Sequence, residues 1–126
     1  MTDLSQYEQR NLADEGVWME VEDPSGNPLG IHLLLAGNDS QVYQKELRKQ
    51  QDKMLKKNKM KISAEEAENQ NLNLLSACTL NWQGVEYQGV ELECNRENIR
   101  WLYKNFPFIR EQADDFIGDR ANFLGE

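Results

Sequence analysis

The sequence has little of the chemistry on which most enzymes depend. It contains one histidine, His32, and two cysteines, Cys78 and Cys94, with no Cys-x-x-Cys spacing. A zinc site needs about four such ligands, and nucleophilic catalysis needs a serine or cysteine beside a base. Neither of the glycine-rich motifs that cradle phosphate is present. We therefore expect no metal, no cofactor and no enzymatic activity, and two reduced thiols as in most cytosolic proteins.

Long apolar runs are missing as well. No stretch approaches the roughly 18 apolar residues that span a bilayer, and residues 1–16 lack the basic and apolar regions of a secretory signal. The mean hydropathy of −0.79 is low, yet 39% apolar residues are too many for a wholly disordered chain. These observations predict a soluble cytoplasmic protein with no membrane partner.

Charge is abundant and unevenly distributed, with a net value of −8. Residues 45–61 hold eight Lys or Arg and two acidic residues, which gives +6. The rest of the chain holds six basic and twenty acidic residues, which gives −14. Such a bipolar molecule can steer charged partners, and it favours a homo-oligomer built by head-to-tail contacts.

The basic segment 45–61 has two interpretations. It could contact the phosphates of a nucleic acid, or it could be a solvated helix and loop balanced by acidic regions of the same or a neighbouring subunit. The segment has no interleaved aromatic residue for base stacking, and the whole chain is acidic. The second interpretation is favoured, so nucleic acid is not the expected partner.

A single domain of the α+β class fits the length and pattern. Residues 1–16 are acidic and weakly patterned, which predicts a loose N-terminal arm or a short frayed helix before a domain over 17–126. The alternation of Val17, Met19 and Val21 is typical of a half-buried strand. The turn sequence Asp-Pro-Ser-Gly at 23–26 then predicts a β-hairpin. The second strand has an apolar face formed by Leu29, Ile31, Leu33 and Leu35.

About four helices are predicted after this hairpin. A helix over about 40–57 begins at Asp39 or Ser40. Its apolar stripe is thin, which indicates a peripheral helix, and a mobile loop is expected around residues 56–62. A helix over 64–78 begins with a capping box of Ser63 and Glu66. Its core face is formed by Ala67, Leu74, Leu75 and Cys78.

A short irregular hairpin or loop is predicted near 80–93, where two glycines interrupt β-favouring residues. Asn95 then caps a further helix, and Pro107 ends it while suiting the first turn of the next. The two helices should form an angled pair, because the chain breaks at Asn-Phe-Pro-Phe. Their apolar faces are Ile99, Leu102, Tyr103 and Phe106 in the first and Ile109, Ala113, Phe116 and Ile117 in the second.

The order of these features resembles the tail assembly chaperones of long-tailed bacteriophages and prophages. The resemblance covers about residues 16–124. It is carried by the Gly-Asn-Asp-Ser helix start at 37–40, the Trp-Gln-Gly turn at 82–84 with Asn-Arg-Glu-Asn after it, and the helix from Arg110 to Phe123. None of these stretches is a catalytic motif.

The resemblance implies a non-enzymatic role in phage tail assembly. Such chaperones bind and solubilise the tape measure protein, help to recruit the major tail protein around it, act in the host bacterial cytoplasm and are absent from the mature virion. Residues off the predicted core faces are the candidates for a partner-binding or self-association surface. These are Trp101, Phe108, Phe123 and Leu124, each with a satellite core contact as the alternative.

Two other functions remain open at this point. One is a structural or connector protein that stays in the phage particle. The other is a nucleic-acid-binding regulator that uses residues 45–61.

Overall fold

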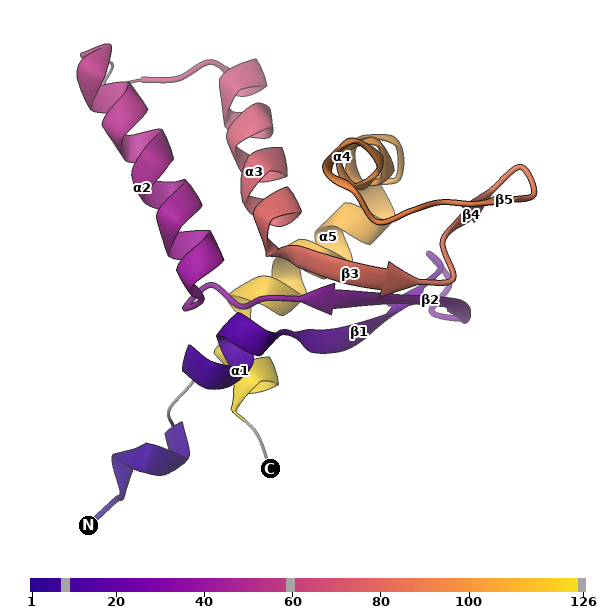
Figure 1. Ribbon diagram of the computed structural model, residues 1–126, viewed down its shortest axis with the longest axis horizontal. Coiled ribbons are helices and arrows are strands. Elements are labelled where there is room, and N and C mark those ends of the chain that lie inside the picture. Colours follow the sequence, from indigo (N-terminus) through magenta and orange to yellow (C-terminus); the bar gives the residue numbers. More distant parts are fainter. Residues whose placement is uncertain (8–9, 59–60, 125–126) are drawn as a thin grey trace.

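Three antiparallel strands form the base of the fold. The computed structural model describes residues 1–7, 10–58 and 61–124. β1 (Val17–Glu22) and β2 (Pro28–Leu35) make the predicted N-terminal hairpin, and β3 (Thr79–Gln83) pairs with the other side of β2 (Figure 1). Part of the segment expected to be an irregular hairpin or loop is therefore a strand of the main sheet. Its partner lies far away along the chain, so local pattern did not indicate the pairing.

The turn between β1 and β2 is the one that its sequence predicts. The backbone oxygen of Asp23 accepts a hydrogen bond from Gly26 N at 2.9 Å, and its carboxylate accepts from the backbone of Ser25 and Asn27. The start of β2 departs from the expected alternation. Glu20 pairs with His32 and Glu22 pairs with Pro28, so β2 carries extra residues in a bulge. Leu29 lies in that bulge and is 42% exposed, so its predicted place on the apolar face is wrong.

One face of the sheet forms one side of the hydrophobic core. Alternate residues of β1 and β2, together with Trp82 of β3, point into it, and their neighbours along the strands, such as Trp18 and Glu20, are exposed. This is the half-buried alternation expected of an antiparallel sheet with one covered face. The inward residues of the hairpin are Met19, Val21, Leu33 and Leu35.

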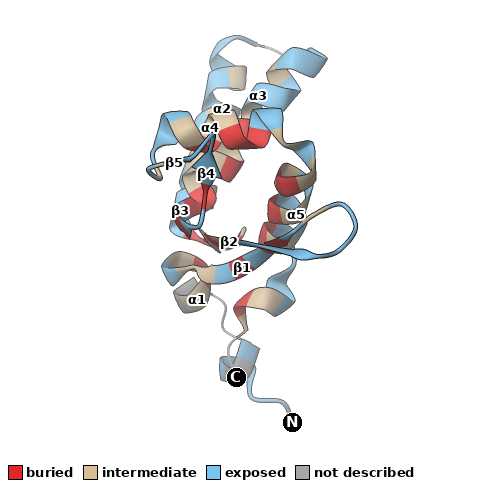
Figure 2. Ribbon diagram, turned by 90° about the vertical axis from the view of Figure 1, so that its right-hand side faces the viewer, coloured by how far each residue is buried: buried red, intermediate tan, exposed pale blue. Residues whose placement is uncertain are grey.

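Three helices cover this face, as Figure 2 shows by their inward-facing buried residues. They are α3 (Ala64–Cys78), α4 (Arg96–Asn105) and α5 (Pro107–Gly118). The hydroxyl of Ser63 and the side chain of Asn95 accept the predicted N-cap hydrogen bonds of α3 and α4. The helical part of the core consists of Leu72, Leu75, Cys78, Ile99, Leu102, Tyr103, Ile109, Ala113 and Ile117.

The buried face of α3 is shorter than predicted. Ala67 is exposed and Leu74 is only half-buried, whereas Leu75 and Cys78 are buried as predicted, together with Leu72, which was not predicted. The first turns of α3 extend beyond the sheet and lie beside α2 instead (Figure 1). Only the last turns of α3 therefore reach the core.

α2 (Gln41–Lys56) is the peripheral helix that its thin stripe predicts. Ser40 caps it by accepting a hydrogen bond from Tyr43 N at 3.2 Å, and no residue of α2 is buried. The side chain of Gln50 donates to the backbone oxygen of Gln70 in α3 at 3.0 Å. The predicted mobile loop after α2 includes residues 59–60, which lie outside the described residues.

The break between α4 and α5 falls at Phe106, whose backbone is non-helical. Pro107 then occupies the first turn of α5, where its missing N–H has no cost. α5 also closes the outer edge of the sheet. The side-chain amide of Gln112 accepts from Glu22 N at 2.9 Å and donates to Glu22 O at 2.8 Å, as a neighbouring strand would.

The N-terminal region is more structured than a loose arm. It contains a 3-10 turn, η1 (Leu4–Tyr7), and a short helix, α1 (Arg10–Glu15). Ala13 is 1% exposed, and its backbone oxygen accepts a hydrogen bond from Gly37 N. α1 therefore packs on the domain, which fits the short helix that the sequence left open.

Candidate protein-binding surface

Four aromatic side chains form a continuous row on one flank of the molecule. The ring centroids of Tyr87 and Trp101 are 4.9 Å apart, those of Trp101 and Phe106 are 5.6 Å apart, and those of Phe106 and Phe108 are 6.4 Å apart. Each contact is edge-to-face, the arrangement that aromatic quadrupoles favour. We call these four residues the aromatic row.

The helix break places two members of this row. Phe106 ends α4 and caps α5, and its backbone oxygen accepts from Ile109 N at 2.9 Å. Trp101 lies on the flank of α4, away from its buried face of Ile99, Leu102 and Tyr103. Phe108 lies in the first turn of α5, so the helix pair brings Trp101 of α4 and Phe108 of α5 onto one flank with Phe106 between them.

A small β-hairpin supplies the outer end of the row. β4 (Glu86–Tyr87) and β5 (Val90–Glu91) pair antiparallel and project beside α4 (Figure 1). The indole N–H of Trp82 donates to Leu92 O at 2.9 Å, which fastens the end of this hairpin to the sheet. Tyr87 is therefore held against Trp101 although it comes from a separate segment.

The aromatic row is only partly covered. Tyr87 is 46% exposed and Val90, its cross-strand partner, is 61% exposed, while the three other rings are half-buried. Aromatic side chains that are fixed in place and still accessible are typical anchors of protein interfaces. The row can bind apolar side chains of a partner at a small cost in side-chain entropy.

The small hairpin that carries Tyr87 also carries two acidic residues. Glu86 and Glu91 are exposed and face each other directly across β4 and β5. Like charges in such positions repel. Successive residues of a strand point to opposite faces, so these two carboxylates lie on the face of the hairpin away from the Tyr87 ring.

The four predicted partner-binding residues separate into two groups. Trp101 and Phe108 belong to the aromatic row, and both are half-buried and pack against the core, which is the contact predicted as the alternative. Phe123 is 1% exposed and packs on Phe116, with ring centroids 5.7 Å apart. It is a core residue in this fold, so its expected exposure is wrong, and Leu124 beside it is half-buried.

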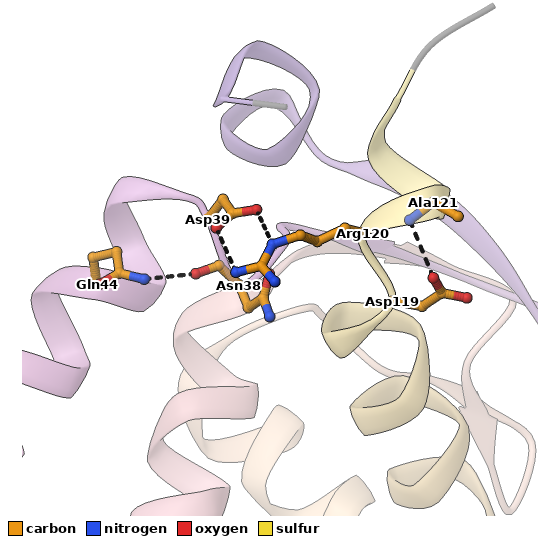
Figure 3. Close-up of polar contacts among 6 residues, drawn as sticks. All are labelled: Asn38, Asp39, Gln44, Asp119, Arg120 and Ala121. Carbon is orange, nitrogen blue, oxygen red and sulfur yellow. Dashed lines mark hydrogen bonds and ion pairs between the residues drawn. The ribbon is translucent and has the colours of Figure 1, made fainter. Parts of the chain in front are cut away.

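The burial of Phe123 follows from contacts that bind the C-terminal segment to the loop before α2. The guanidinium of Arg120 donates to both carboxylate oxygens of Asp39, at 2.8 and 3.1 Å (Figure 3). A Cβ atom at Gly37 would lie only 3.0 Å from the Phe123 ring, so the ring occupies space that glycine leaves free. These contacts are long-range and were not readable from the helix pattern.

Sequence reasoning missed two members of the row. Phe106 was assigned to the core face of its helix, and Tyr87 lay in a segment without a clear pattern. The position of Tyr87 between Gly84 and Gly89 could have indicated its exposure. A residue in a short hairpin between two glycines lies too far out to reach the core.

The groups that could support catalysis are dispersed. The His32 ring lies 3.2 Å from the carboxylate of Glu20 on the exposed face of the sheet. Burial raises the pKa of the Cys78 thiol to about 12, which leaves it protonated and unreactive at neutral pH. Over residues 1–7, 10–58 and 61–124, no cluster of three or more His, Cys, Asp or Glu could hold a metal ion.

Comparisons with known proteins gave no match. No protein-family model matches the chain, and neither does any curated protein sequence or any solved structure. Within the described part of the chain, no helix is long and apolar enough to cross a membrane.

Proposed function

We propose that this protein is a non-enzymatic assembly chaperone of a long-tailed phage or prophage, and that its aromatic row binds the tape measure protein. The observation that carries the proposal is the row itself, because its rings are fixed by mutual contacts while Tyr87 remains 46% exposed. A chaperone that keeps an amphipathic client in solution needs an accessible apolar surface bordered by charge. The row supplies the accessible apolar surface, and the exposed Glu86 and Glu91 supply charge in the same small hairpin as Tyr87.

The polar properties of the chain support the same role. A net charge of −8 helps to keep a complex with an aggregation-prone client in solution. In this proposal the protein acts in the host bacterial cytoplasm, helps to recruit the major tail protein and leaves before the virion is complete.

Coexpression with the cognate tape measure protein tests the proposal. The wild-type protein should raise the soluble yield of the tape measure protein and co-purify with it. Trp101→Ala and Tyr87→Ala should each weaken this complex, by roughly tenfold or more for an aromatic anchor. Tyr87 is exposed, so its variant is expected to keep the fold even if Trp101→Ala does not.

Trp18→Ala is the matched control, since Trp18 is 42% exposed and lies on the opposite face of the sheet. It should leave client binding unchanged. Equal losses in the Trp18 and Tyr87 variants would refute the role of the row. Mass spectrometry of purified virions gives a second check, because recovery of the protein there would favour a connector that stays in the particle.

A further inference from the structure

A second surface, separate from the aromatic row, lies between α2 and α3. The two helices stand side by side above the sheet (Figure 1) and enclose a groove of about 360 Å³. Its lining is mostly polar, with Met54 among the few apolar side chains. None of its lining residues belongs to the hydrophobic core.

Three lysines line the groove along α2: Lys49 and Lys53 lie in the helix, and Lys57 is its C-cap. Lys49, Lys53 and Lys57 recur every four residues, which places their Cα atoms about 6 Å apart along the helix axis. All three are exposed, and Arg96 adds a fourth positive charge from the start of α4. Among the residues that the structure describes, none of the three lysines takes part in an ion pair.

The α3 wall carries amide side chains. Asn69, Gln70 and Asn73 line it, and amides can both donate and accept hydrogen bonds. The groove also contains two carboxylates, Glu46 and Glu66. A ligand here meets a positive row, a neutral polar row and two negative points.

We propose that this groove is a docking site for an acidic, largely polar helix of a partner protein. The carboxylates of a helix with Glu or Asp at every fourth position share the spacing of the lysine row, about 6 Å. Such a helix lying along α2 can pair with several lysines at once. Its remaining polar side chains meet the amides of α3, and a basic residue between its acids can pair with Glu46.

Nucleic acid fits the groove less well. The lining contains no aromatic side chain on which a base could stack. Glu46 and Glu66 repel phosphates, and the rest of the acidic chain repels a long polyanion. A short acidic helix that engages only the groove avoids most of that repulsion.

The proposal is tested by fluorescence anisotropy with a labelled Ala-rich peptide of about 20 residues, long enough to form a helix. The peptide carries Glu at every fourth position, and a second peptide carries Lys at the same positions. At low salt the full-length protein should bind the Glu peptide and not the Lys peptide. Added salt should weaken this binding, because the contacts are between partly exposed charges.

Two charge-matched double variants locate the site. Lys49→Gln with Lys53→Gln should lower affinity for the Glu peptide about five- to tenfold, as expected for two lost ion pairs. Arg48→Gln with Lys56→Gln removes the same charge from exposed residues of α2 outside the groove lining, and should change affinity less than about twofold. Gln has nearly the helix propensity of Lys and Arg, so α2 should persist in both variants.

Three results would overturn the assignment. If the Glu peptide does not bind at low salt, the groove is not a docking site for an acidic helix. If both double variants lose affinity equally, the peptide is attracted by the overall charge of α2 and not by the groove. Binding of a labelled DNA duplex that exceeds peptide binding and depends on Lys49 and Lys53 would make it a nucleic-acid site. The groove does not depend on the proposed client role, since Tyr87→Ala, a change at an exposed residue, should leave peptide binding intact.

Discussion

α2 and α5 are both amphipathic helices, but they contribute to this molecule in different ways. α5 buries Ile109, Ala113 and Ile117 against the sheet and the neighbouring helices. α2 buries none of its residues and is held mainly through its N-cap and its contact with α3. The comparison shows that a wide apolar face carries stability, whereas a thin one leaves a helix free to present charge.

The first prediction tests how much the packing of α5 and of α2 contributes to stability, and it has the largest expected effect. Ile117→Ala should lower the free energy of unfolding by about 2–5 kcal/mol, because it leaves a cavity at a residue that is 2% exposed. Val42→Ala in α2 should change it by no more than about 0.5 kcal/mol, because Val42 is exposed. Urea denaturation measures both, and comparable losses would mean that α2 is part of the cooperative core.

The second prediction compares two tyrosine hydroxyls. Thr79 Oγ1 donates to Leu75 O, so the Tyr103 hydroxyl, 2.7 Å away, must donate to Thr79. Tyr103→Phe should therefore cost about 1–2 kcal/mol in unfolding free energy. Tyr43→Phe in α2 removes the hydroxyl of a half-buried residue, which has no hydrogen-bond partner in the described part of the chain. It should change the unfolding free energy by less than about 0.5 kcal/mol.

A similar cost for both substitutions in thermal or urea denaturation would contradict the assigned hydrogen bond. The important result is that Tyr103→Phe costs more unfolding free energy than Tyr43→Phe, since both substitutions remove the same hydroxyl group from different surroundings.

The third prediction concerns the pH dependence of the unfolding free energy, and it has the smallest expected effect. Burial raises the pKa of Cys78 from 9.0 to about 12, so the folded state holds this proton more tightly than the unfolded state. Its contribution to stability is complete below pH 9 and is lost as the pH rises from there toward 12. Between about pH 9 and pH 10 we expect a loss of about 1 kcal/mol from this group.

Denaturation of the wild type and Cys78→Ala at several alkaline pH values checks this expectation. The variant should show a weaker dependence on pH, whatever its absolute stability. Cys94→Ala is the control, because burial raises the pKa of that half-buried thiol as well, but without the full enclosure of Cys78. A slope unchanged by Cys78→Ala would show that the thiol ionises freely in the folded state.

Local features of the fold were readable from the sequence. The α+β class, the N-terminal hairpin with its turn at Asp23 and the helix starts at Ser40, Ser63 and Asn95 were all predicted correctly. Each depends on interactions between residues only a few positions apart. The peripheral place of α2 was also predicted, since the width of an apolar stripe is visible in one dimension.

Features made by distant segments were not readable in this way. The pairing of β3 with β2, the bulge that exposes Leu29 and the shortened core face of α3 depend on what each segment meets after folding. The candidate site shows the same division. Trp101 was selected because it lies off its helix's main face, but its association with Tyr87 required the β4–β5 hairpin to fold back onto α4.

The sequence by itself therefore determined where helices and turns begin, which faces are apolar, and that residues 45–61 are basic in an acidic chain. These properties follow from spacing, capping and charge, which act over a few residues. Three features were visible only in the tertiary structure: the burial of Phe123, the row of four aromatic rings, and the position of the α2 lysines opposite the amides of α3. Those outcomes depend on packing between segments far apart in the chain, and packing is decided by which surfaces fit together in three dimensions.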